Sequence, residues 1–177
     1  MLVSELPEIF REAVAPEVHT YSIGKPYIQN GYVYATDGTM MVRMPCPPEG
    51  VTGAATEGKL PCDDGFPWSA SLYDSDPISV PALPEEEYVE CPCCSGFGSH
   101  CCGCSCDECA GLGREPVRIG VKVGRWLLAD DLLRRIDDLG ADLYGPLSIA
   151  EDAALRFVRG DIEGLVKPMK KPSACDT

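Results

Sequence analysis

The sequence predicts an α+β protein in which two helices pack on antiparallel sheets and an irregular, cysteine-rich insertion interrupts the domain. Apolar side chains recur at helical spacing within residues 4–14 and again within residues 127–139. Alternating apolar runs separated by turn residues follow each of these stretches. Between them, eight of the 11 cysteines lie within residues 91–109. The 177 residues are enough for one domain that carries such an insertion.

The first predicted helix spans residues 4–14. Ser4 is its predicted N-cap, because a serine hydroxyl can accept a hydrogen bond from a free amide of the first turn. Pro16 ends it. The buried stripe consists of Leu6, Ile9, Phe10, Ala13 and Val14.

Three strands are predicted to follow as a meander. Residues 27–29 and 32–34 flank Asn30-Gly31, the strongest signal for a two-residue hairpin, because both central residues of a type I′ turn need positive φ. Asp37-Gly38 predicts a second turn before a strand over residues 39–44. The first half of the domain is therefore expected to end at residue 45.

Residues 46–90 are rich in Pro, Gly and acidic side chains, with ten acidic residues and Lys59 as the sole basic one. They predict an acidic loop with one short strand at 78–80, held against the domain by Phe66 and Trp68. Two interpretations stay open. The segment is a solvated loop, or it is a surface that imitates the charge of DNA or docks on a basic partner.

The second half is predicted to resume with a strand over residues 117–123, where apolar and polar side chains alternate. A helix over 127–139 follows and ends at Gly140. Strands are then expected at 143–149, 154–158 and 165–169, before a flexible tail at 171–177. Residues 4–44 and 117–169 thus share one order, a helix and then three strands, within a discontinuous domain made of 1–45 and 116–170.

Residues 91–113 contain two copies of the pattern Cys-x-x-Cys-x-Gly-x-Gly. Two thiolates three residues apart on a tight turn bind one ion, and two such turns complete a tetrahedron. The glycines let the backbone turn beneath the sulfurs. The sequence therefore predicts Zn²⁺ as the cofactor of a closed, structural site, with disulfides and an iron–sulfur or redox role as alternatives. Its predicted ligands are Cys91, Cys94, Cys106 and Cys109.

This repeat resembles the cysteine-rich zinc region of the DnaJ-type chaperones, which have four copies where this chain has two. The resemblance implies the metal knuckle alone, because the chain has no His-Pro-Asp motif. Four cysteines are left over beside the knuckles, namely Cys93, Cys101, Cys102 and Cys104, with His100 next to them. Cys101 and Cys104 are alternates for one of the pairs or, with His100, ligands of a second ion; spare thiols are the other interpretation.

Residues 31–45, Gly-Tyr-Val-Tyr-Ala-Thr-Asp-Gly-Thr-Met-Met-Val-Arg-Met-Pro, resemble the Ala-Thr-Asp-Gly strand pair of bacterial sliding clamps, the β subunit of DNA polymerase III. Residues 117–123, 127–139 and 166–170 are similar to the end of the third domain of that clamp. The resemblance implies one clamp-like domain of two βαβββ units. A clamp protomer has three such domains, so a ring would need six copies of this chain, and we leave oligomer formation open.

In sliding clamps the helices face the duplex, so the resemblance implies that Arg134 and Arg135 are candidate nucleic-acid-facing residues. Alternatively these arginines pair with Asp130, Asp131 or Asp138 at helical spacing.

The last strand of a clamp helps to line a groove for short hydrophobic peptides. The resemblance therefore implies that Val166, Pro168 and Met169 are candidate partner-binding residues, with ordinary core packing as the alternative.

The net charge of −13 and the absence of any apolar run near the ~20 residues of a membrane span predict an acidic cytoplasmic protein without membrane contact. Neither histidine, His19 nor His100, lies in a catalytic signature, and no phosphate-binding loop is found. We therefore expect a non-enzymatic, phage or mobile-element protein that binds a replication factor. The second hypothesis is an acidic, DNA-mimicking inhibitor of a DNA-binding defence enzyme, of the anti-CRISPR type.

Overall fold

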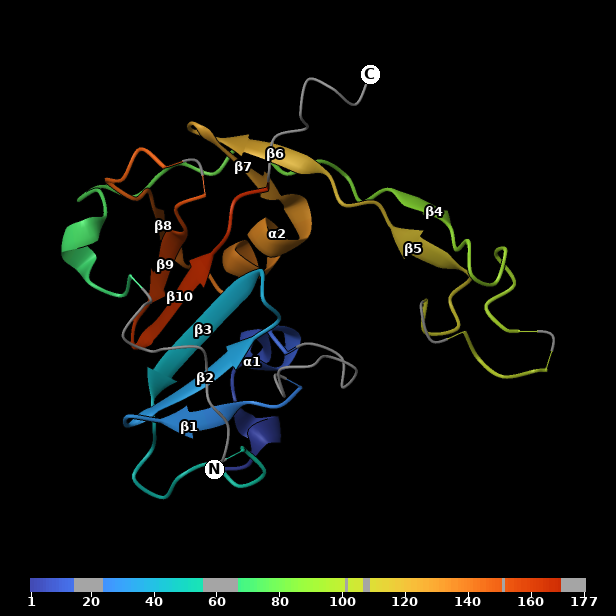
Figure 1. Ribbon diagram of the computed structural model, residues 1–177, viewed down its shortest axis with the longest axis horizontal. Coiled ribbons are helices and arrows are strands. Elements are labelled where there is room, and N and C mark those ends of the chain that lie inside the picture. The colour runs from blue at the N-terminus through green and yellow to red at the C-terminus, as the bar shows by residue number, and fades with distance from the viewer. Residues whose placement is uncertain (15–23, 56–66, 101, 107–108, 151, 170–177) are drawn as a thin grey trace.

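The computed structural model describes residues 1–14, 24–55, 67–100, 102–106, 109–150 and 152–169. Its largest element is an antiparallel sheet whose six strands are β1 (Tyr27–Gln29), β2 (Tyr32–Thr36), β3 (Met40–Pro45), β8 (Asp142–Tyr144), β9 (Leu155–Arg159) and β10 (Ile162–Val166). The strands are hydrogen-bonded in the order β1-β2-β3-β10-β9-β8 (Figure 1). Each half of the chain therefore supplies three strands, and the last strand of one half pairs with the last strand of the other.

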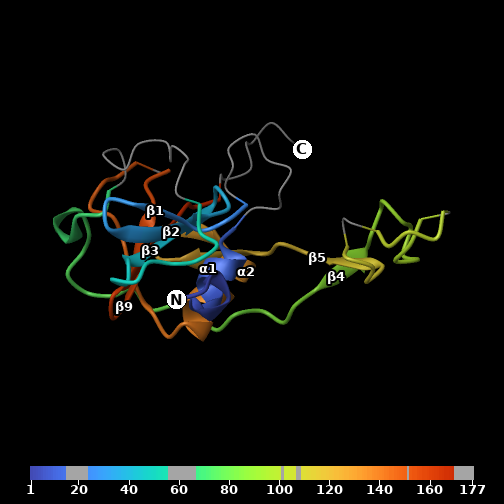
Figure 2. The same ribbon diagram turned by 90° about the horizontal axis from the view of Figure 1, so that it is seen from below.

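Two α-helices, α1 (Glu8–Glu12) and α2 (Asp130–Asp138), cover one face of this sheet (Figures 1 and 2). Alternate residues of β2 show the two faces, because Val33 and Ala35 join the helices in the main core whereas Tyr34 packs on the opposite side. The predicted class, helices packed on mostly antiparallel sheets, is confirmed. Among the described residues, no helix has the length and apolar character of a membrane span.

The first predicted helix is shorter than expected. A 3₁₀ turn, η1 (Val3–Glu5), comes first, and α1 begins only after Pro7. Proline disfavours helical backbone in the residue before it, and Leu6 is accordingly extended, with φ −64° and ψ 149°. Ser4 therefore lies inside the 3₁₀ turn and is not the cap of the helix.

The predicted Asn30-Gly31 hairpin is confirmed. Both residues have positive φ, 50° and 78°, and Gln29 pairs directly with Tyr32. The second turn lies one residue later than predicted. Thr36 pairs with Met41, and the Asp37 amide donates to the Met40 carbonyl at 3.3 Å, so the two turn residues are Gly38 and Thr39 and not Asp37 and Gly38.

The predicted helix over 127–139 begins three residues too early. Residues Trp126–Ala129 form strand β7, which pairs with β6 (Gly120–Val123). Val123 faces Trp126 across a two-residue turn in which Gly124 has φ 59°. A glycine at the first turn position is a hairpin signal that the apolar spacing of the following leucines concealed. The end of the helix at Gly140 is confirmed, with φ 64°.

The three closing strands are also displaced. The strand predicted at 143–149 is β8, which ends at Tyr144 because Gly145 and Pro146 follow. The strand predicted at 154–158 is β9. The strand predicted at 165–169 is β10, which ends at Val166, two residues before Pro168. The predicted tail lies outside the described residues.

Segment 46–90 contacts the body at several points, although the strand predicted at 78–80 does not form. The Ile78 amide donates to the Leu143 carbonyl at 2.7 Å, and a 3₁₀ turn, η3 (Ala70–Leu72), lies nearby in sequence. Trp68 is buried against Tyr34, so its predicted anchoring role is confirmed; Phe66 lies outside the described residues. The Arg43 guanidinium lies 4.0 Å from the centre of a Trp68 ring.

Strands β4 (Tyr88–Glu90) and β5 (Arg114–Pro116) form a two-stranded ribbon that leads away from the body (Figure 1). The cysteine-rich residues 91–113 connect the two strands at the far end of the ribbon. We call residues 88–116 the arm. Figure 2 shows from a second direction that the arm projects beyond the sheet and both helices.

Candidate metal centre

The two Cys-x-x-Cys turns of the arm bring the four predicted ligands together. Cys91, Cys94, Cys106 and Cys109 are all buried, and their Sγ atoms all lie within 4.8 Å of one another. The Cys91 and Cys106 sulfurs are 3.9 Å apart, and those of Cys94 and Cys109 are 3.7 Å apart. Sulfurs at the corners of a tetrahedron around zinc, with bonds of about 2.3 Å, lie about 3.8 Å apart. The cluster therefore has the dimensions of a four-thiolate metal site.

The two turns repeat each other's hydrogen bonds at an offset of fifteen residues. The Gly98 amide donates to Cys94 Sγ at 3.2 Å, and the Gly113 amide donates to Cys109 Sγ at the same distance. The turns are also joined reciprocally, because the Cys91 amide donates to the Gly113 carbonyl and the Cys106 amide to the Gly98 carbonyl. Amides aimed at two of the sulfurs stabilise negative charge on thiolates.

Glycine is required where the two turns meet. A Cβ on Gly98 would lie 2.3 Å from the Gly111 carbonyl oxygen, and one on Gly113 would lie 2.2 Å from that of Gly96. Both residues also have positive φ, 71° and 74°. The second glycine of each motif is therefore needed for two reasons: it adopts the positive φ of its turn, and it lets the backbones of the two turns lie against each other.

The four cysteines form the buried side-chain cluster of residues 91–113 as far as the structure describes them. The Glu115 carboxylate accepts a hydrogen bond from Cys91 Sγ at 2.9 Å and, together with burial, raises the pKa of that thiol. A bound divalent cation acts in the opposite direction, because a coordinating thiol is deprotonated. Sequence reasoning missed Glu115, which lies outside the motif.

The remaining predicted ligands do not join the four sulfurs. Cys102 and Cys104 are exposed, and Cys101 lies outside the described residues. His100 is half-buried, and one of its ring nitrogens lies within 4.8 Å of the sulfurs of Cys93 and Cys106. None of the eight described cysteines forms a disulfide.

The candidate partner-binding residues lie at the end of β10. Val166 is fully buried in the main core. Pro168 is half-buried, and Met169 packs partly against that core while its amide donates to the Leu127 carbonyl at 2.7 Å. For Val166 the alternative interpretation, ordinary core packing, is therefore confirmed.

The candidate nucleic-acid-facing arginines on α2 both contact oxygens of this chain. Arg134 pairs with Asp130 at 3.9 Å and with Glu86 at 3.8 Å, and it also donates to the Pro84 carbonyl. The alternative pairing at helical spacing is thus confirmed for Arg134. Arg135 instead pairs with Asp37, on the turn between β2 and β3.

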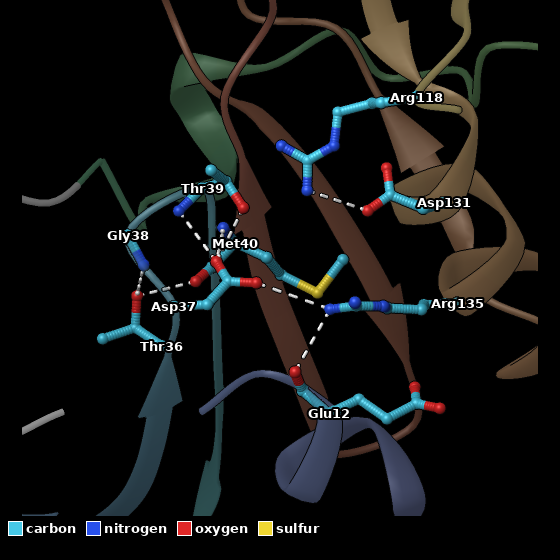
Figure 3. Close-up of polar contacts among 9 residues, drawn as sticks. All are labelled: Glu12, Thr36, Asp37, Gly38, Thr39, Met40, Arg118, Asp131 and Arg135. Carbon is cyan, nitrogen blue, oxygen red and sulfur yellow. Dashed lines mark hydrogen bonds and ion pairs between the residues drawn. The ribbon is translucent and has the colours of Figure 1, made fainter. Parts of the chain in front are cut away.

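Asp37 organises this turn and links the two halves of the body (Figure 3). Its Oδ1 accepts hydrogen bonds from the amides of Thr39 and Met40, both at 2.8 Å, and from the Thr39 hydroxyl at 2.7 Å. Its Oδ2 lies 3.4 Å from Arg135 Nη1, which also donates to the Glu12 carbonyl at the end of α1. Burial works to raise the pKa of Asp37, but these hydrogen bonds and the arginine hold the pKa below its usual value.

No protein-family model, curated protein or solved structure matches the chain. What the structure establishes is a mixed α/β body and a buried four-cysteine cluster that could hold a metal ion.

Proposed function

We propose that this chain is a non-enzymatic zinc protein with a sliding-clamp-like body, and that it acts through protein–protein contacts in DNA replication or repair. The observation that carries the proposal is the position of the four-cysteine cluster at the end of an arm (Figure 1). Four thiolates close a tetrahedral site and leave no coordination position for water or substrate. Zinc therefore serves here to shape a surface.

Thiolate ligands favour a soft or borderline ion over magnesium or calcium, and four of them in a tetrahedron suit zinc or iron. Two turns that each supply one Cys-x-x-Cys pair are the pattern of structural zinc sites. Metal analysis of the purified protein separates zinc from iron directly.

The mirrored strand order of the body supports the clamp-like part of the proposal. Three strands from each half meet at the β3–β10 pair, and both helices lie on one face, as expected for two related units around a pseudo-dyad. The helices nevertheless differ from a DNA-facing surface. The α1 helix carries two glutamates and one arginine, and α2 carries four aspartates and two arginines, so both are net acidic. Phosphate binding needs the opposite charge, which favours a protein partner.

The arm offers apolar side chains for such a partner. Phe97 and Leu112 occupy equivalent positions between the two glycines of each motif, and they are 82% and 70% exposed. The arm also carries the exposed acid Glu90, whose carboxylate lies next to Gly96. The partner surface that fits them combines apolar and basic side chains.

Affinity capture from the native cell, with metal analysis of the same sample, tests the proposal. We expect a zinc-loaded protein that retains replication or repair proteins, and we expect the combined changes Phe97→Asp and Leu112→Asp to release them. Ile149→Asp is the matched control, because Ile149 is an equally exposed apolar residue of the body. Met169→Glu tests the clamp-type peptide site. A protein free of zinc, or capture that none of the arm and strand variants alters, would contradict the proposal.

The acidic segment favours the second candidate function, a DNA-mimicking inhibitor. Glu85, Glu86 and Glu87 form an exposed run at the base of the arm, and Asp74 and Asp76 are exposed as well. This function predicts salt-sensitive binding to a basic nucleoprotein enzyme, weakened when Glu85 and Glu87 are both changed to Gln. Capture of such an enzyme in place of replication proteins would favour it.

A further inference from the structure

A second group of ligand atoms lies beside the four-cysteine cluster. Cys93 Sγ, a ring nitrogen of His100 and Cys106 Sγ all lie within 4.8 Å of one another. Cys106 belongs to both groups. Cys93 is exposed although it lies between the buried Cys91 and Cys94, so successive sulfurs of the first turn face different sides.

The fold of the loop brings these three residues together. Ser99 pairs with Ser105, the His100 amide donates to the Cys104 carbonyl at 2.9 Å, and the Gly103 amide donates to the His100 carbonyl at 2.8 Å. The chain thus reverses tightly between the two motifs and places His100 beside Cys106. The Cys106 amide also donates to the Gly98 carbonyl, which fixes this turn against the one that carries Cys93.

We propose that the arm holds a second, exchangeable zinc ion on Cys93, His100 and Cys106, with the Cys106 thiolate bridging the two ions. This inference rests on the proposed zinc centre and adds to it. A thiolate has lone pairs enough for two metal ions, and one thiolate, one imidazole and a shared thiolate form a ligand set that zinc accepts. Binding releases the thiol proton of Cys93, whereas the imidazole binds in its neutral form.

The second ion differs from the first in its access to solvent. Three protein ligands leave the fourth position of a tetrahedron open, to be taken by water or by a side chain of another molecule. Cys93 is exposed and His100 half-buried, so solvent and chelators reach this ion more easily than the one among four buried sulfurs. The second ion is therefore the weaker one and the first to be lost.

Zinc titration of the metal-free full chain, followed by dialysis and metal analysis, tests the inference. We expect about two zinc ions per wild-type chain, one of them removed first by a competing chelator. Cys93→Ser and His100→Ala should each bind about one ion. Cys102→Ser is the matched control, because Cys102 is an exposed thiol of the same loop outside both groups, and it should still bind about two.

Cadmium replacement gives an independent measure of the shared sulfur. Two ¹¹³Cd resonances coupled to each other through the Cys106 thiolate are expected for the wild type, and a single resonance for His100→Ala. One ion in the wild type at saturating zinc, or two ions in His100→Ala, would overturn this inference and leave the four-cysteine centre intact. A chain that binds no zinc at all would instead overturn the centre itself.

Discussion

Replacing Cys109 with serine tests the metal centre most directly. The distances of 3.7 and 3.9 Å between paired sulfurs correspond to metal–sulfur bonds of about 2.3–2.4 Å in a tetrahedral site. Once the second ion has been removed by a chelator, X-ray absorption at the zinc edge should therefore show about four sulfurs at about 2.3 Å in the wild-type centre and about three in Cys109→Ser. Because changes outside the ligand shell already lower zinc affinity about 10- to 100-fold, loss of a ligand should lower it by more than about 100-fold.

The same variant separates the arm from the body. The described residues of 91–113 contribute none of the main core, so the body keeps its packing when the arm loses its metal. Hydrogen exchange should become fast for the amides of 91–113, while the midpoint of thermal unfolding of the body shifts by less than about 2 °C.

Cys104→Ser is the control, because Cys104 is an exposed thiol of the arm outside the four-sulfur group. If Cys104→Ser lost as much zinc as Cys109→Ser, the ligand assignment would be wrong. Cooperative unfolding of the whole chain in Cys109→Ser would refute the independence of arm and body.

Two further predictions concern close contacts. Gly98→Ala should weaken zinc binding in chelator competition, because its Cβ would meet the Gly111 carbonyl oxygen. Gly103→Ala is the control and should leave zinc binding unchanged, because Gly103 has a similar positive φ of 79° but lies in open space. Equal losses of zinc affinity in the two variants would contradict the close-approach argument. Asp37→Ala should lower the free energy of unfolding by about 2–4 kcal/mol in urea at pH 7. Each hydrogen bond to a charged group contributes about 1.5–3 kcal/mol, and at this half-buried turn water replaces part of the three bonds that the carboxylate accepts. The pKa of Asp37 is lowered in the folded chain, so the carboxylate's contribution to the free energy of unfolding is complete above about pH 4 and is lost as the pH falls below that. The difference in free energy of unfolding between wild type and Asp37→Ala should therefore shrink in acid. A difference that stayed constant would count against the carboxylate's role.

The parts of the structure that sequence analysis predicted correctly are those in which a short motif fixes its own geometry. Asn30-Gly31 specifies a turn that few other residue pairs form. The two Cys-x-x-Cys-x-Gly-x-Gly motifs contain both the candidate metal ligands and the glycines that let the backbone turn beneath them. The predicted start of α2 was wrong because Leu128 fits the apolar stripe of a helix, with Leu132 and Ile136, as well as it fits a strand. The hairpin with β6, closed by the two-residue turn at Gly124, decides for the strand.

Contacts between distant residues were beyond sequence analysis. The pair of Arg135 and Asp37 spans 98 residues, and helical spacing offered Asp131 and Asp138 as nearer partners for the arginine. Nothing in the spacing of His100 and Cys93 from the motif cysteines indicates that they gather at Cys106. These groupings depend on how the loop between the motifs reverses, which local preferences do not specify.

The position of the insertion explains why the body is expected to stay folded when the arm loses its metal. The insertion, residues 46–113, follows β3 and precedes β6 in the sequence, so it lies between the two halves of the body. The halves are closed on each other by the β3–β10 pairing and by Arg135, which contacts both the Glu12 carbonyl and the Asp37 carboxylate. These contacts do not pass through the arm. Gain or loss of zinc is therefore expected to reshape the exposed surface around Phe97 and Leu112, where the proposed partner would bind, while the sheet and helices remain folded.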